Sequence, residues 1–98
     1  MQAAEDIEKF LKNVSYDDFI NGSLVQSAVE RKLEIIGEAL NRVRKENEEK
    51  LYSVKDAHRI IGLRNVIAHG YDIVVPKIIW DAVQHNLPLL KQNIKDLL

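Results

Sequence analysis

The sequence contains no cysteine, two prolines and four glycines among its 98 residues. Without cysteine, the chain cannot form a disulfide, a thiolate zinc site or a thiol nucleophile. It also has no apolar run approaching the roughly 20 residues that a membrane-spanning helix needs. The first residues, MQAAEDIEKF, carry acids where a secretory signal peptide has a basic and then an apolar segment. These absences lead us to expect a cytoplasmic protein that does not enter the membrane.

Several common catalytic patterns are missing as well. There is no P-loop and no H-E-x-x-H zinc element. Gly22-Ser23 is not followed by the paired aspartates of a nucleotidyltransferase, so we do not expect this chain to transfer nucleotides itself. The carboxylates are scattered, and His58 and His85 have no partner at metal-ligand spacing. We therefore expect ordinary helix-face positions for these two histidines, and neither a metal nor a cofactor.

Charge of neither sign dominates, since 14 Lys and Arg residues oppose 15 Asp and Glu residues for a net charge of −1. This balance argues against a wholly basic nucleic-acid coat but leaves room for a local basic cleft. A chain of this length predicts a single domain over residues 1–98. Because so short a chain buries only about two thirds of its unfolded surface, a homodimer would add useful buried area.

Apolar residues recur at helical spacing through nearly the whole chain. We predict an all-α, up-and-down bundle of four main helices plus a short helical turn. The main helices are expected at residues 3–13, 24–48 and 54–69, and from 76 along an apolar stripe that reaches 97.

Local signals in the first half of the chain mark where these helices begin and end. Ser15 and Asp18 have the spacing of a capping box, which predicts a short helical turn ended by Asn21-Gly22. Ser23 is expected to cap the long helix. The charged run RVRKENEEK, residues 42–50, is interpreted as the solvated end of that helix in preference to a binding patch.

The second half carries similar signals. Ser53 and Asp56 repeat the capping-box spacing, and Gly70 suits the end of the helix that they open. Pro76 fits the first turn of the last helix. Pro88 lies inside the apolar stripe of that helix and should kink it without ending it, because the stripe continues in phase.

One arginine and one histidine lie in apolar surroundings. Arg64 is four residues from both Ile60 and Ala68, so it points toward the same side as apolar residues. A guanidinium there needs an anionic partner or a surface that another subunit covers. His69 is about 140° further around an ideal helix, so the two side chains diverge unless the helix ends at Gly70. Spacing alone favours an ordinary Arg and His at a capped helix end over a shared site.

The apolar surroundings of Arg64 also indicate where two copies of the chain would meet. If a second subunit covers this side, the interface of a homodimer should include the helix that carries Arg64. That helix also carries Ile60, Leu63 and Ile67.

The segment RNVIAHGY, residues 64–71, matches the pattern R-x-x-x-x-H-x-Y. With a polar residue after the arginine, it resembles the signature of HEPN-domain ribonucleases and, more narrowly, of the HepT-like toxin family. The first helix starts later in the chain than in that family. The resemblance otherwise covers most of the chain, through the segments YDDFI (16–20), ERKLEIIGEALNRV (30–43), IIGLRNVIAHGYDIV (60–74) and IIWDAVQHNLPLLKQNI (78–94).

The resemblance implies a HEPN-like bundle and a metal-independent endoribonuclease acting as the toxin of a type VII-like toxin–antitoxin pair. RNA would be the substrate, and its ribose 2′-hydroxyl would attack the adjacent phosphate. His69 would act as general acid and base, since its reference pKa near 6.5 suits neutral pH. Arg64 would bind the phosphate oxygens, and Asn65 would orient the histidine or the phosphate. Two such motifs would face each other across a homodimer.

Tyr71 belongs to the regulatory part of the same resemblance. It implies that a cognate MntA-like nucleotidyltransferase, the antitoxin, attaches AMP to this tyrosine and so blocks the cleft. An ordinary loop aromatic packed on Trp80 is the alternative role for Tyr71. For the whole protein, the alternative is a non-catalytic helical dimer that binds or supports a partner nucleotidyltransferase.

Overall fold

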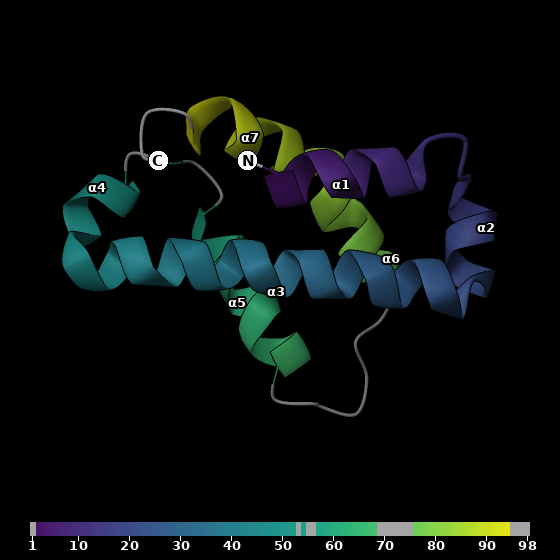
Figure 1. The fold of residues 1–98 in the computed structure, drawn as a ribbon, viewed down its shortest axis with the longest axis horizontal. Helices are drawn as coiled ribbons and strands as arrows, with labels where there is room; N and C mark the ends of the chain where they lie inside the picture. Colours follow the sequence, from purple (N-terminus) through teal and green to yellow (C-terminus); the bar gives the residue numbers. More distant parts are fainter. Residues whose placement is uncertain (1, 53, 55–56, 69–75, 95–98) are drawn as a thin grey trace.

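The computed structural model describes residues 2–52, 54, 57–68 and 76–94. Within these residues the chain forms α-helices and one π-helical segment, and no strand, which confirms the predicted all-α fold. Figure 1 shows the long helix α3 running the length of the molecule, with α2 at one end and α4 at the other. The elements are α1 (Gln2–Leu11), α2 (Tyr16–Asn21), α3 (Ser23–Glu46), α4 (Glu48–Tyr52), α5 (Ala57–Ala68), α6 (Pro76–Asp81), η1 (Ala82–Asn86) and α7 (Leu87–Ile94).

The core lies where α1 and α5 pack against α3, and the last helical segments join it through contacts of η1 with α5 and of α6 with α2. On α3, Val29, Leu33, Ile36 and Leu40 are buried, and on the last helical segments Ile79, Val83, Leu87 and Leu90 are buried, as the spacing predicted. Burial of apolar surface of this kind is the main source of stability in so small a domain. The largest fully buried side chains are Phe19, Ile7, Leu33, Ile36, Leu40, Leu51, Ile60, Ile79, Leu87, Leu90 and Val29.

Two ion pairs tie α1 to its neighbours. Lys32 on α3 lies 3.0 Å from Asp6, and Lys91 on α7 lies 3.1 Å from Glu8. At the α2 end, Trp80 packs against Phe19 and against Tyr16, with ring centroids 5.4 and 5.7 Å apart. Trp80 is thereby placed in the packing of α2 against α6.

The start of α2 has the predicted capping box. The Ser15 side chain accepts a hydrogen bond from the Asp18 backbone N–H, and the Asp18 side chain accepts one from the Ser15 N–H. The cap predicted for the next helix is wrong, because Ser23 is already inside α3. Gly22 takes the cap position, and no side-chain cap bond forms there.

The long helix ends earlier than its charged tail predicted. Asn47 closes α3 by donating its backbone N–H to the Val43 carbonyl over 2.8 Å. Its side-chain oxygen then accepts a hydrogen bond from the Lys50 N–H at 3.2 Å and so caps α4, a short helix that the pattern did not predict. The first helix is also shorter than predicted and ends at Leu11, ahead of Asn13 with its positive φ of 64°.

The predicted capping box at Ser53 and Asp56 lies outside the described residues. The helix predicted from residue 54 begins later than expected. Val54 is buried in a bend, and α5 spans Ala57–Ala68. Gly70 and the predicted connector at 71–75 also lie outside the described part.

Pro76 begins α6, and the chain continues past Pro88 as predicted. The distortion takes the form of the π-helical segment η1, where the Leu87 N–H donates to the Ala82 carbonyl five residues back. A wider turn just before Pro88 accommodates a residue that has no N–H and whose ring crowds the preceding turn. No helix within the described ranges is long and apolar enough to cross a membrane.

Candidate active site

Arg64 lies on α5 with its side chain directed at α3. Only 22% of that side chain is exposed. Its hydrocarbon stem packs against Gly37, which is buried in the middle of α3. The guanidinium at the far end of the stem is therefore held at the edge of the α3–α5 contact, where it can meet both protein and solvent.

Gly37 is the residue that permits this approach of the two helices. A Cβ atom built on Gly37 would lie 2.5 Å from the Arg64 Cγ, and nearer still to the Arg64 Cβ. These atoms are at the root of the Arg64 side chain, so they cannot move aside without α5 moving too. Any residue larger than glycine at position 37 would push Arg64 away from its place.

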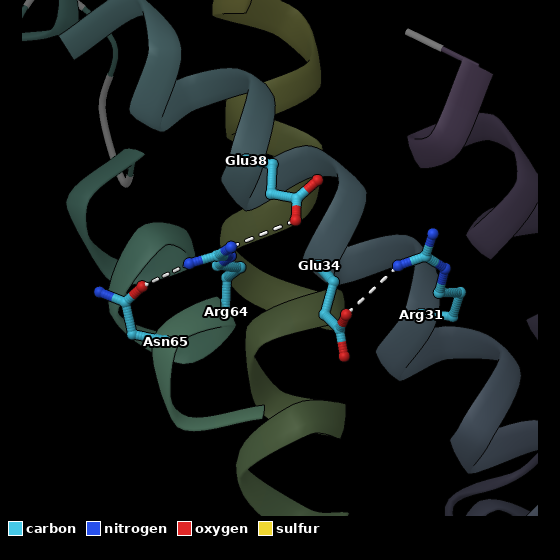
Figure 2. Close-up of polar contacts among 5 residues, drawn as sticks. All are labelled: Arg31, Glu34, Glu38, Arg64 and Asn65. Carbon is cyan, nitrogen blue, oxygen red and sulfur yellow. Dashed lines mark hydrogen bonds and ion pairs between the residues drawn. The ribbon is translucent and has the colours of Figure 1, made fainter. Parts of the chain in front are cut away.

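Two polar neighbours fix the guanidinium. Its Nη2 lies 3.1 Å from the Glu38 carboxylate on α3, and its Nη1 donates to the Asn65 side-chain oxygen, also at 3.1 Å (Figure 2). Each of these nitrogens carries a second N–H, so the group retains donors for an anion. Its Nε is buried and has no hydrogen-bond partner among the described residues.

The Glu38 carboxylate is the anionic partner that neutralises Arg64 in its apolar surroundings. Glu38 is one of three carboxylates spaced four residues apart on α3, with Glu34 and Glu30 before it. Glu34 pairs with Arg31 at 3.3 Å, as Figure 2 shows. Burial and then the charge of Glu34 raise the pKa of the Glu30 carboxyl above its ordinary value. Acidic side chains thus gather on the α3 segment that precedes the Arg64 contact.

After Glu38, toward the C-terminal end of α3, the charged side chains beside Arg64 are basic. A shallow cavity of about 360 Å³ opens there, lined by Glu38, Asn41, Arg42, Lys45 and Arg64. Three of its five lining side chains are cationic and one is anionic. A larger cavity of about 610 Å³ lies between α1 and the η1–α7 segment, and none of the predicted site residues lines it.

The structure brings two of the four predicted site residues together. Arg64, which lines the small cavity, donates a hydrogen bond to its neighbour Asn65. His69 and Tyr71 lie outside the described residues, and so does the proposed packing of Tyr71 on Trp80. His58 and His85 are exposed on helix faces, as predicted. The described residues contain no group of three or more His, Cys, Asp or Glu side chains able to share a metal ion.

Two of the four residues named on the predicted interface helix are buried within the chain itself. Ile60 is 0% exposed and Leu63 is 8% exposed within the chain itself, so both belong to its own core and are not free to cover a second copy. The apolar spacing on α5 was produced by packing against α3. Arg64 and Ile67 remain partly exposed and are available to a partner.

Gly37 and Glu38 are neighbours of Arg64 that the pattern did not identify. A signal for Gly37 is present, because it lies on the buried face of α3 between Leu33 and Leu40. Glycine inside a helix costs about 1 kcal/mol relative to alanine, so its use on a buried face points to a close approach of another backbone. Glu38 has no comparable local signal.

Comparison with known proteins finds a ribonuclease family and relatives named as ribonucleases. The model of the family described as "Ribonuclease HepT-like" matches residues 1–97. A protein of Methanocaldococcus jannaschii named "Putative RNase" is 33% identical over 95 residues, covering 97% of this chain and 86% of that protein. One of the same name from Caldanaerobacter subterraneus subsp. tengcongensis is 34% identical over 98 residues, covering 100% and 87%.

A further relative carries the family name itself. The "Probable ribonuclease HepT" of Thermococcus cleftensis is 30% identical over 96 residues, covering 98% of this chain and 86% of that protein. No solved structure matches the chain. The match of the family model over residues 1–97, together with relatives of this identity and coverage, shows that the chain belongs to the HepT-like ribonuclease family.

Proposed function

We propose that this protein is a metal-independent endoribonuclease whose catalytic residues are Arg64, Asn65 and His69. The observation that supports this most is the placement of Arg64. Its guanidinium is held by Glu38 and Asn65 at the edge of a cavity that carries two further cations. A half-buried arginine with spare donors, in a chain of a ribonuclease family, suits the binding of a phosphate.

The chemistry needs no group beyond the substrate and these side chains. The 2′-oxygen of the ribose attacks the adjacent phosphorus, the 2′-O–P bond forms, and the bond to the 5′-oxygen of the next nucleotide breaks. One imidazole takes the 2′-hydroxyl proton and another returns a proton to the leaving oxygen, which leaves a 2′,3′-cyclic phosphate and a 5′-hydroxyl. General acid–base catalysis of this kind contributes typically about 10²–10⁴-fold. Arg64 stabilises the charge that grows on the phosphate oxygens.

A homodimer would supply the second imidazole. Each chain carries one motif histidine, His69, directly after the last residue of α5. If two copies associate with their α5 ends facing, two His69 and two Arg64 side chains meet at one cleft. The partly exposed Ile67 would then join the interface, while Ile60 and Leu63 stay in the core of each chain.

The purified chain is expected to cut single-stranded RNA in the presence of EDTA, and the His69→Ala variant, prepared identically, is expected to be inactive. The loss in the variant excludes a contaminating nuclease. Light scattering on the same active sample should give twice the chain mass of 11.3 kDa. RNA that stays intact, or that is cut equally by the variant, would contradict the nuclease and favour a non-catalytic partner of a nucleotidyltransferase.

We further propose that Tyr71 accepts AMP from a cognate MntA-like nucleotidyltransferase, which would make this chain the toxin of the pair. The phenol oxygen would attack the α-phosphorus of ATP, pyrophosphate would leave, and the phenol proton would be lost. The added phosphate would bring negative charge to a position two residues past His69. That charge should repel RNA and compete for the basic side chains around Arg64.

Tyr71→Phe is expected to keep nuclease activity and to escape inhibition by the nucleotidyltransferase with ATP. The reason is that this change removes only the hydroxyl, and a phenol of pKa near 10 is a poor base at neutral pH. Mass spectrometry should find AMP on the wild-type chain and none on the variant. Tyr52→Phe is the matched control, because Tyr52 is 66% exposed and should not affect modification. An adduct on Tyr16 or Tyr52, or loss of cleavage in Tyr71→Phe, would contradict this assignment.

A further inference from the structure

The cavity beside Arg64 is lined by one stripe of α3. Glu38, Asn41, Arg42 and Lys45 are spaced at three, four and seven residues from the first, which places them on one face of a helix. Arg64 from α5 forms the remaining wall. We call this surface the α3–α5 groove, defined by Glu38, Asn41, Arg42, Lys45 and Arg64.

The groove extends the positive charge away from Arg64 along α3. Glu38 contacts the Arg64 guanidinium directly, Arg42 is about 6 Å further along the helix axis, and Lys45 is about 10 Å further. Arg42 and Lys45 are exposed, and neither has an ion pair or hydrogen bond within the described residues. Arg64 is partly neutralised by Glu38. Beyond it along α3, Arg42 and Lys45 have no carboxylate partner among the described residues.

Asn41 is the uncharged polar residue that lines the groove. Asn41 accepts a hydrogen bond from Arg44 through its side-chain oxygen at 2.5 Å, which fixes the orientation of its amide. The Asn41 amide N–H₂ therefore remains available beside Arg42 and Lys45. A groove that presents only N–H donors, apart from Glu38, is suited to an extended anion.

We propose that the α3–α5 groove binds the backbone phosphates of a single RNA strand on one side of the phosphate held by Arg64, with Arg42 and Lys45 as the binding residues. The proposal rests on the proposed nuclease function and adds the path of the substrate. A charged groove that follows the backbone is how proteins bind single strands irrespective of sequence. It also changes the interpretation of residues 42–50, because part of this charged run lies next to Arg64 and not at a distant solvated end.

The test measures the binding of a fluorescein-labelled single-stranded oligouridylate of 12 nucleotides, with the His69→Ala chain used so that the RNA is not cut. Arg42→Gln and Lys45→Gln are introduced together, and binding is titrated at several salt concentrations. We expect at least about tenfold weaker binding at low salt. The slope of log affinity against log salt should become shallower by about 1.4, since each lost phosphate contact on a single strand contributes about 0.7.

The matched control is the double variant Lys12→Gln and Arg59→Gln. It removes one lysine and one arginine, both exposed and both outside the groove, so it changes the net charge equally. It should leave RNA binding and its salt dependence nearly unchanged. Unaltered melting curves by circular dichroism will show that all variants are folded. Equal losses in the two double variants, or no measurable RNA binding before the groove is changed, would overturn the proposal.

Two further arms separate the possible failures. AMP binding should not depend on Arg42 and Lys45, and a loss of AMP affinity with unchanged RNA affinity would assign the groove to a nucleotide and overturn the RNA path. Cleavage in EDTA is measured with the same groove changes in the chain that retains His69. If that chain never cuts RNA but the groove variant still binds more weakly, the nuclease proposal fails and the groove proposal stands.

Discussion

Replacing Arg64 with Ala is expected to reduce RNA cleavage at least about 100-fold while the helical fold persists, which is the usual cost of losing one donor to a transition-state anion. Arg64→Lys tests the geometry more sharply, because lysine keeps the charge but cannot bind two oxygens with a planar fork. We expect this variant also to lose most of its activity. Single-turnover cleavage of labelled RNA in EDTA measures both effects.

The effect of these changes on stability should be small. The Arg64–Glu38 pair is partly exposed, with 22% and 49% of the two side chains accessible, so its contribution is below about 1 kcal/mol. Arg59→Ala on the same helix is the control, since Arg59 is exposed and lies outside the groove. It should keep both activity and melting temperature. A collapse of the helical signal in Arg64→Ala would instead mean that the arginine serves the fold alone.

Gly37→Ala is expected to lower the melting temperature by roughly 5–15 °C and to reduce cleavage more than unfolding explains. The added methyl group would overlap the root of the Arg64 side chain, and such overpacking costs about 1–3 kcal/mol. The better helix propensity of alanine offsets up to about 1 kcal/mol of this. The remaining strain should separate α5 from α3 and move the guanidinium away from Glu38.

Gly62→Ala makes the same substitution at a second glycine, and we expect it to have the opposite effect on the melting temperature. Gly62 lies on α5, and a Cβ atom added there has nothing within 4 Å. The gain in helix propensity should therefore raise the melting temperature by a few degrees and leave cleavage unchanged. Thermal unfolding followed by circular dichroism compares the two variants. Similar melting temperatures for both would show that the α3–α5 contact tolerates a side chain at position 37.

Much of the fold was predictable because its determinants are local. The capping box of Ser15 and Asp18 forms as its spacing indicates, and Pro76 opens a helix as its ring geometry favours. The apolar stripe of the last helix is buried through Leu90, since its residues Ile79, Val83, Leu87 and Leu90 keep spacings of three and four residues across the π-helical segment before Pro88. Where local signals competed, the prediction failed. Asn47 ends one helix and caps the next, and a continuous charged run hid that break.

The sequence by itself determined the helical class of this protein and its membership of a ribonuclease family, and it led to the proposal of Arg64, Asn65, His69 and Tyr71 as site residues. The helical class follows from periodicity, whereas the family and the proposed site residues follow from a resemblance that covers most of the chain and includes the motif at residues 64–71. Only the tertiary structure decided that Gly37 seats the stem of Arg64 and that Glu38, 26 residues earlier, pairs with its guanidinium. It also decided that Arg42 and Lys45 line a groove beside the arginine. The physical reason is that helix periodicity reports which face of a helix is buried but not which residue of another helix it meets, because that depends on how closely the two backbones approach.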